Sequence, residues 1–133
     1  MSADRSCYLD SSALVKLAVA EPESAALRRW LRRREPLLTS ALARTEVARA
    51  LKPFGTEAIE RGEAVLRRVA IIRISDRVLR LAGTMEPQQL RSLDAIHLAT
   101  AQLAGASLRA LVTYDDRMAE VARTLKMSVH APK

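Results

Sequence analysis

The sequence has very little cysteine, no long apolar stretch and no leader-like N-terminus. Its single cysteine, Cys7, excludes an internal disulfide and is typical of proteins from a reducing compartment. Because Cys7 lies in an apolar run, we expect it in the core. No segment reaches the roughly 18 consecutive apolar residues of a membrane helix, and the N-terminus lacks the apolar stretch of a secretory signal. These absences predict a cytoplasmic protein without a membrane span.

The composition is that of a folded, basic protein of one domain. A chain of 133 residues can bury enough surface to fold without disulfides. Hydrophobic residues make up 49% and charged residues 28%, which excludes a disordered chain. The net charge of +7 favours a polyanionic partner, either nucleic acid or an acidic protein. The densest basic run is 28–34, but such a run on a helix is more often a solvent-exposed face, so the net charge is the stronger indication.

Strand-like and helix-like segments alternate along the chain. The predicted strands are the apolar or β-branched runs 6–9, 37–39, 70–74 and 111–113, with 127–129 as a candidate edge strand. The predicted helices are 12–19, 22–34, 41–51, 56–68, 76–82, 93–104 and 116–125. Helices between successive strands require crossover connections, which favours an α/β fold with a doubly wound parallel sheet of four or five strands. No linker or repeat divides the chain, so we expect residues 1–133 to form a single domain.

Two acidic side chains follow predicted strands directly. Asp10 ends the first apolar run and precedes two serines, and Asp115 follows the strand 111–113. In an open parallel sheet the ligand crevice lies at the carboxyl ends of the strands, so both are expected at one edge. Asp10 has an alternative role as a helix N-cap. Asp116 stands beside Asp115, so one of this pair could cap the next helix while the other faces the crevice.

Glu46 is unexpected where it stands. It shares a helix stripe with alanine and valine residues that should pack inward. A buried unpaired charge is costly, so Glu46 needs a partner. The alternatives are an arginine, such as Arg44 or Arg49, and a cation or a water bound to one.

Asp94 lies near the start of a predicted helix, with His97 one turn later on the same side. A first-turn aspartate is favoured by the helix dipole alone. A lone histidine in such a stripe is more often packed or hydrogen-bonded than catalytic. No second histidine and no cysteine lies at zinc-ligand spacing, which argues against a structural zinc site.

The predicted topology brings these acids to one edge of the sheet. Several carboxylates there would repel one another and raise one another's pKa values. A divalent cation removes that repulsion, and ligation by oxygen alone selects Mg²⁺ or Mn²⁺ over zinc or copper. The sequence therefore predicts a hard-metal site.

Four segments together resemble the PIN-domain ribonucleases, and specifically the VapC toxins of bacterial toxin–antitoxin modules. Each fragment alone is unspecific, but the four in this order and in a chain of this length are specific, and the resemblance covers nearly the whole chain. The segments are Leu9-Asp10-Ser11-Ser12-Ala13-Leu14-Val15-Lys16, Thr45-Glu46-Val47-Ala48-Arg49-Ala50, Leu93-Asp94-Ala95-Ile96-His97-Leu98-Ala99-Thr100-Ala101 and Leu111-Val112-Thr113-Tyr114-Asp115.

The resemblance implies a doubly wound PIN fold and endonucleolytic cleavage of RNA with Mg²⁺ or Mn²⁺. It also implies a homodimer and inhibition by a small cognate VapB-type antitoxin. The family's acidic positions fall on Asp10, Glu46, Asp94 and Asp115, which are the expected catalytic residues. Of these, Asp10, Asp94 and Asp115 are the expected metal ligands, while Glu46 acts directly or through a water.

The family's small hydroxyl positions fall on Ser11 and Thr113, which we expect to orient ligands or substrate. Asp116 is the alternative to Asp115, because the acid after the last core strand varies by one position in such proteins. Asp115 is favoured, since it occupies the third place of the Thr-x-Asp pattern.

Other acid-based α/β enzymes fit less well. A haloacid-dehalogenase-like phosphatase needs a second aspartate two residues after the first, and that position is Ser12. A phosphoreceiver domain needs its acidic pair early, whereas the pair here is late. The remaining alternative is a non-catalytic, basic RNA-binding or scaffold protein with a PIN fold, which the presence of all four acids disfavours.

Overall fold

The structure, a computed structural model, describes residues 5–133 and is built around a five-stranded sheet. All strand pairs are parallel, and the strand order is β3-β2-β1-β4-β5. The strands are β1 (Ser6–Leu9), β2 (Leu37–Ser40), β3 (Ala70–Ile72), β4 (Leu108–Val112) and β5 (Val129–His130). The expected doubly wound parallel α/β sheet is confirmed.

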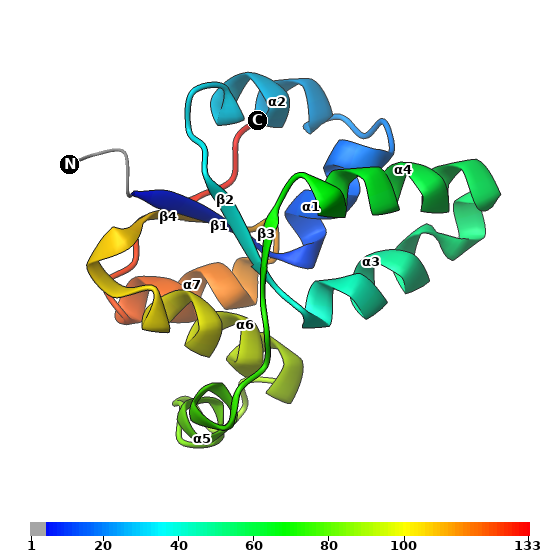
Figure 1. The fold of residues 1–133 in the computed structure, drawn as a ribbon. Coiled ribbons are helices and arrows are strands. Elements are labelled where there is room, and N and C mark those ends of the chain that lie inside the picture. Colours follow the sequence, from blue (N-terminus) through cyan, green and yellow to red (C-terminus); the bar gives the residue numbers. More distant parts are fainter. Residues whose placement is uncertain (1–4) are drawn as a thin grey trace.

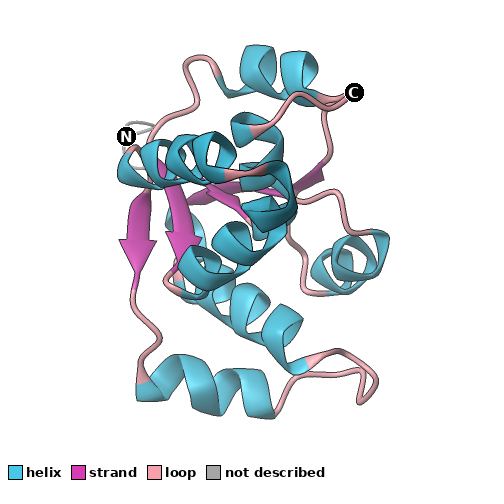
Figure 2. Cartoon of the chain, turned by 90° about the vertical axis from the view of Figure 1, so that its right-hand side faces the viewer, coloured by secondary structure: helices cyan, strands magenta, loops and turns pink. Residues whose placement is uncertain are grey.

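Helices connect these strands and cover both faces of the sheet (Figures 1 and 2). They are α1 (Ser11–Ala18), α2 (Ser24–Leu31), α3 (Leu42–Leu51), α4 (Thr56–Arg67), α5 (Asp76–Gly83), α6 (Ser92–Leu103) and α7 (Asp116–Thr124). Two short 3-10 turns, η2 (Lys52–Phe54) and η3 (Gly105–Ser107), follow α3 and α6. Within residues 5–133, none of the helices combines the length and the apolar character that a membrane crossing requires.

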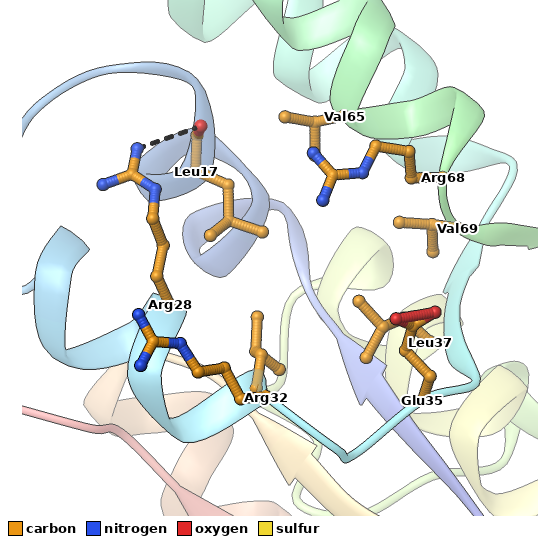
Figure 3. A pocket seen from close by; sticks show the side chains of 9 residues that line it. Leu17, Arg28, Arg32, Glu35, Leu37, Val65, Arg68 and Val69 are labelled. Carbon is orange, nitrogen blue, oxygen red and sulfur yellow. Dashed lines mark hydrogen bonds between the residues drawn. The ribbon is translucent and has the colours of Figure 1, made fainter.

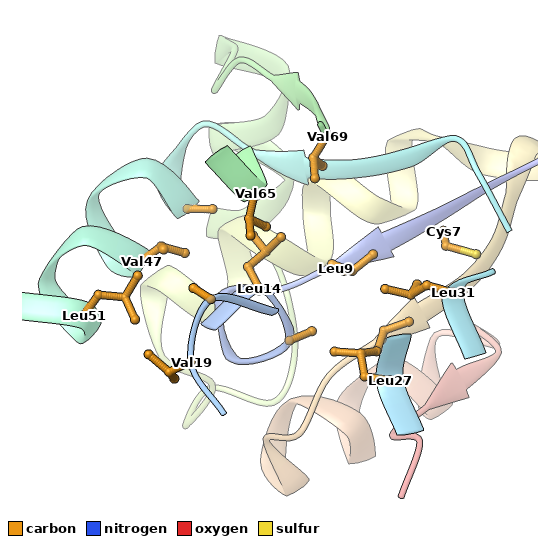
Figure 4. Packing of buried hydrophobic residues seen from close by; sticks show 14 of the residues in the cluster. Cys7, Leu9, Leu14, Val19, Leu27, Leu31, Val47, Leu51, Val65 and Val69 are labelled. Atoms are coloured by element: carbon orange, nitrogen blue, oxygen red, sulfur yellow. The ribbon is translucent and has the colours of Figure 1, made fainter. Parts of the chain in front are cut away.

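Alternation along β1 divides the core into two layers. Cys7 and Leu9 point to the face covered by α1 to α4, and Tyr8 points to the face covered by α6 and α7. All three side chains are fully buried, so the expected core position of Cys7 is confirmed. Figure 4 shows the first layer, a single buried cluster that includes Leu9, Leu14 and Val47. Burial on both faces makes β1 the centre of the molecule.

The strand order reverses direction between β1 and β4. From β1 the chain winds outward through β2 to β3, and it then returns to the other side of β1 as β4 and β5. The carboxyl ends of β1 and β4 therefore flank a topological switch point, where open α/β sheets bind ligands. Asp10 and Thr113 are the residues that follow these two strands.

Several element boundaries differ from those predicted. α2 begins at Ser24 and ends at Leu31, well before the predicted end, and Arg33 beyond it takes a left-handed backbone conformation (φ 64°) that a helix cannot continue. β4 begins at Leu108, because pairing with β1 overrides the weak strand propensity of Ala110. β3 ends at Ile72, before the predicted end at 74, and the edge strand β5 is 129–130 rather than 127–129. Ser75 caps α5 as predicted, since its Oγ accepts the Val78 N–H.

α3 and α4 pack closely at one glycine. A methyl group placed on Gly62 would overlap Cδ1 of Leu51 and would lie 3.2 Å from Cγ1 of Val47. A larger residue at position 62 would require the buried Leu51 side chain to shift. The contact fixes the position of α3, which carries Glu46.

Candidate functional site at the switch point

Asp10 is fixed at the end of β1 by hydrogen bonds on both carboxylate oxygens. Its Oδ1 accepts from the Ala13 backbone N–H (3.0 Å) and from Ser12 Oγ (2.6 Å). Its Oδ2 accepts from Thr113 Oγ1 (2.5 Å). Asp10 is the N-cap of α1, so the capping role weighed as an alternative is the one observed, and the two serines do not cap. Its side chain is buried, with 3% of the residue exposed.

Two hydroxyl groups join the ends of β1 and β4. Thr113 donates to Asp10 and accepts from the Asp115 N–H (3.1 Å). Ser12 donates to Asp10 and accepts from the Tyr114 N–H (2.9 Å). The two strand ends and the start of α1 are thereby held as one unit. Ser12 was not expected to have this role.

Glu46 reaches the same edge from α3 and bonds to groups on two other helices. Its Oε1 accepts from Ser11 Oγ at 2.5 Å and from His97 Nε2 at 2.6 Å. The partner of this inward-facing acid is therefore a histidine and a serine. Neither Arg44 nor Arg49 forms an ion pair with it in the described chain, so the arginine alternative is wrong.

His97 is fully engaged between Glu46 and Tyr8. The Tyr8 hydroxyl lies 2.7 Å from His97 Nδ1, and both residues are buried. A neutral imidazole satisfies every atom if Nε2–H donates to Glu46 and Nδ1 accepts from the Tyr8 O–H; this tautomer follows from the hydrogen-bond network. The expectation of a hydrogen-bonded histidine is thus confirmed. Tyr8 was missed, and its only signal in the sequence is a polar atom in a run predicted to be buried.

Asp94 and Asp115 present carboxylate oxygens that the protein does not fully occupy. Asp115 is the N-cap of α7, and its Oδ1 accepts from the backbone N–H groups of Arg117 (2.9 Å) and Met118 (3.0 Å). Its Oδ2 takes no hydrogen bond within residues 5–133, and neither oxygen of Asp94 does. Asp116 is exposed in the first turn of α7. Asp115 thus combines the cap with a free oxygen at the edge.

The pKa shifts indicate that these acids act on one another. Burial raises the pKa of Asp94, and the Asp115 carboxylate raises it further, with Glu46 acting in the same direction. Burial also raises the pKa of Asp10, although its hydrogen bonds oppose that shift. Burial acts to raise the pKa of Glu46 as well, but the hydrogen bonds from His97 and Ser11 outweigh it and the net shift is downward. Burial therefore disfavours the ionised form of Asp10 and Asp94, and His97 and Arg91 only partly offset this effect at Asp94.

The residues fit a hard cation with an incomplete protein shell. No three histidine, cysteine or acidic side chains between positions 5 and 133 stand close enough to form a ready-made metal cage. Mg²⁺ rarely uses such a cage, because it keeps several waters and binds through one or two carboxylates plus substrate phosphates. In the described part of the chain no lysine or arginine forms an ion pair with Asp10, Asp94 or Asp115. Both nitrogens of His97 are occupied, so the available donors are oxygens.

A separate cavity lies at the opposite edge of the sheet, beside the start of β2 (Figure 3). It has a volume of about 360 Å³ and an apolar floor ringed by charged side chains. Arg28 Nη2 donates to the Leu17 carbonyl at 3.4 Å on its rim. Two arginines of the basic run 28–34, Arg28 and Arg32, therefore border this cavity. The lining residues are Leu17, Arg28, Leu31, Arg32, Glu35, Leu37, Val65, Arg68 and Val69.

Comparisons with known proteins agree with this geometry. Residues 7–124 match the family model of the PIN domain. The chain is 58% identical over 125 residues to Ribonuclease VapC46 of Mycobacterium tuberculosis, with 94% of this chain and 96% of that protein covered. It is 48% identical over 130 residues to Ribonuclease VapC35 of the same species, with the same coverage.

Solved structures with the same fold include a toxin–antitoxin complex from Klebsiella pneumoniae, with a TM-score of 0.66, 27% identity, and coverage of 83% of this chain and 87% of that one. The crystal structure of M. tuberculosis VapC20, described as a sarcin-ricin loop cleaving toxin, gives a TM-score of 0.75 over 96% of this chain and 100% of that chain. At 16% identity, this second match supports the fold alone.

Proposed function

The chain belongs to the PIN-domain family, among its VapC ribonucleases, and from that premise we propose that it is a divalent-metal-dependent endoribonuclease, the toxin of a type II toxin–antitoxin module. The proposal is supported by the links between acids from separate elements near the switch point. Thr113 bonds to the Asp10 carboxylate and to the Asp115 N–H, Ser11 beside Asp10 donates to Glu46, and the pKa of Asp94 is raised by burial and further by Asp115 and Glu46. Asp10 follows β1, Glu46 comes from α3, Asp94 from α6 and Asp115 from the end of the β4 segment.

In this proposal Asp10, Asp94 and Asp115 hold Mg²⁺ or Mn²⁺, and Glu46 completes the catalytic group. Asp94 and Asp115 contribute oxygens that take no hydrogen bond within residues 5–133, and Asp10 contributes a carboxylate oriented by Thr113. When bound, the cation supplies positive charge to the phosphate oxygens and lowers the pKa of a water.

The protein's own hydroxyl and imidazole groups set the orientation of the acids. Ser11 and His97 both donate to Oε1 of Glu46, and within residues 5–133 Oε2 takes no hydrogen bond, so it remains available to a water or substrate. The downward shift in the pKa of Glu46 keeps this carboxylate ionised at neutral pH, so it can accept hydrogen bonds from a water or from the substrate.

The non-catalytic scaffold alternative is not favoured. A scaffold would have no need for acids without ion-pair partners at the edge where PIN-like sheets bind ligands, since such acids cost stability. Both curated relatives described above are named ribonucleases.

We also infer partners and surroundings for this chain. The structural match to a toxin–antitoxin complex supports a VapB-type antitoxin as partner. A net charge of +7 suits both an RNA substrate and an acidic partner segment. We further propose that the chain forms a homodimer, that it is located in the cytoplasm, and that residues 1–133 form a single PIN domain.

The direct test is cleavage of single-stranded and folded RNAs by the purified protein, with Mg²⁺ and with EDTA. Cleavage should require the cation, and Asp94→Asn should reduce it by about 10²–10³-fold, the usual effect of removing one electrostatic group from an active site. Folding is checked by circular dichroism. A folded wild-type protein that binds these RNAs and cuts none of them with Mg²⁺ or Mn²⁺ would favour the scaffold.

A further inference from the structure

A second cavity, the α6–α7 cleft, opens directly beside the proposed catalytic acids. Its volume is about 570 Å³, within the range of roughly 300–1,000 Å³ that small-ligand pockets span. Asp94 forms part of its wall. The cleft is lined by Glu86, Pro87, Gln89, Leu90, Arg91, Asp94, Arg117, Glu120, Val121 and Thr124.

The residues from α7 form a single stripe that leads away from the acids. Arg117, Val121 and Thr124 are spaced four and three residues apart, so they lie on one face of the helix with Glu120 beside them. Because α7 starts immediately after Asp115, Arg117 is nearest the catalytic edge and Thr124 is farthest from it. The cleft therefore has a near end and a far end.

The chemistry changes along that direction. At the near end Arg91 precedes α6 by one residue and Arg117 lies in the first turn of α7, so the cleft is lined by an arginine at the start of each helix that borders the acids. Val121, one turn further along α7, adds an apolar side chain to the wall, and Leu90 adds another beside Arg91. Glu120 adds hydrogen-bond acceptors there.

The arginines, apolar walls and carboxylates of the cleft match the phosphate and the base of a nucleotide. Guanidinium groups bind phosphates, apolar walls accept the faces of a base, and carboxylates accept hydrogen bonds from exocyclic amino groups. The glutamates at 86 and 120 disfavour a second phosphate in the cleft, so the RNA chain would leave after one residue.

We propose that the α6–α7 cleft holds one unpaired nucleotide of the RNA substrate, next to the phosphate that is cleaved. This inference rests on the proposed ribonuclease function. A base inside a duplex cannot enter the cleft, so the substrate is cut where its bases are free of pairing, in loops or single strands. The cleft then contributes to the choice of cleavage position.

The test fills the far end of the cleft. Thr124→Trp adds bulk at an exposed position at the end of α7, and Gln89→Trp is a second variant, at an exposed loop position that also lines the cleft. Gln102→Trp is the matched control, because Gln102 is an exposed, neutral residue of α6 outside the cleft. Thermal unfolding verifies that all the variants fold.

Each protein is assayed with a single-stranded RNA oligonucleotide and with bis(p-nitrophenyl) phosphate, a diester that has no base. The ratio of kcat/KM for RNA to kcat/KM for the diester should fall about tenfold in Thr124→Trp and Gln89→Trp, as expected when contacts worth about 1.4 kcal/mol are lost. The Gln102→Trp variant should retain the wild-type ratio. Equal ratios in all the proteins would overturn the proposal.

RNA substrates that lack single bases identify which nucleotide contacts the cleft. Replacing single nucleotides next to the cleaved bond by abasic residues should raise KM about tenfold at one position for the wild type, and much less for Thr124→Trp. Equal sensitivity of both proteins would contradict the inference.

The proposed function and the cleft can fail separately. If the wild type cleaves neither substrate, the ribonuclease assignment fails, and binding of a fluorescent oligonucleotide then tests the cleft alone. Weaker binding by Thr124→Trp than by wild type and Gln102→Trp supports a nucleotide site, and equal binding by the three proteins overturns it.

Discussion

Tyr8→Phe removes one oxygen atom from the buried chain that ends on Glu46. The Tyr8 hydroxyl lies 2.7 Å from His97 Nδ1, and no part of Tyr8 is exposed to solvent. Phenylalanine fills nearly the same volume, so the variant creates no large cavity. It leaves the ring nitrogen without its donor in a place that bulk water does not reach.

The expected cost follows from that unsatisfied nitrogen. Leaving a buried acceptor unpaired costs about 1–3 kcal/mol. A change of tautomer would not recover this, because Nε2 would then present a lone pair to the Glu46 carboxylate at 2.6 Å. For a domain of this size each kcal/mol lowers Tm by roughly 3–5 °C, so we expect a decrease of about 3–15 °C.

Thermal unfolding by circular dichroism measures the decrease, with Tyr114→Phe as the matched control. The Tyr114 hydroxyl also makes one hydrogen bond, to the Pro132 carbonyl at 2.8 Å, but Tyr114 is partly exposed. Water can replace that bond, so its loss should cost less than about 1 kcal/mol. Equal Tm values for wild type and Tyr8→Phe, or equal losses in the two variants, would refute the account of the buried network.

Three further predictions concern the acids and the packing beneath them. Asp115→Asn should lower RNA cleavage by about 10²–10³-fold while keeping the helix cap, since asparagine also caps. Asp116→Asn should cleave RNA within about threefold of wild type, because Asp116 is exposed. A larger loss of cleavage in Asp116→Asn than in Asp115→Asn would assign the role to Asp116. The pKa of Asp94 is raised above its ordinary value of 3.8, so the metal-free folded protein binds this proton more tightly than the unfolded chain does. The contribution of Asp94 to the free energy of unfolding in EDTA should therefore fall as the pH rises from 3.8 through the raised pKa. Urea unfolding of wild type and Asp94→Asn across that range checks this prediction, and parallel pH profiles of the two proteins would contradict it. Gly62→Ala should destabilise the fold by about 1–3 kcal/mol through overpacking. Gly83→Ala should be neutral or stabilising, because a methyl group at that position meets open space. Similar Tm values for these two variants would count against the packing of α3 on α4.

The sequence was sufficient to predict the sheet because its strands carry strong local signals. The run at Ile71 and Ile72 is β-branched, which indicates β3. Apolar runs end just before Asp10 and Asp115, so β1, β4 and the sheet edge that they share could also be inferred. The N-terminal half of β4 could not, since Arg109 and Ala110 have no strand signal of their own. Pairing with β1 determines their conformation.

The acids were predictable, but their partners were not. Tyr8 and His97 are separated by 89 positions, and Ser11 and Glu46 by 35 positions. Only the packing of α3 against α1 and β2, and of α6 against β2 and β4, brings these atoms together. Local patterns indicate that Glu46 needs a partner, and they suggested arginines that are near it in the sequence. Charge and proximity along the chain can be read from a sequence, whereas tertiary contacts cannot.

The pair at 115 and 116 illustrates a second limit. An aspartate before a helix is favourable both as a cap and as a ligand, so its position alone does not separate the roles. The structure shows that Asp115 has both, since one of its oxygens caps α7 and the other has no protein donor within the described residues.

The central claim is that acids from separate elements bind one divalent cation together at the carboxyl edge of the sheet. A titration of the purified protein with Mn²⁺, followed by electron paramagnetic resonance of the free ion, tests it without any substrate. The account predicts saturable binding by the wild type that is weakened at least about tenfold in Asp94→Asn and in Asp115→Asn, the usual range for loss of a metal-site group, and retained in Asp116→Asn. Binding of equal strength in all four proteins, or no binding by the wild type at millimolar Mn²⁺, would contradict it.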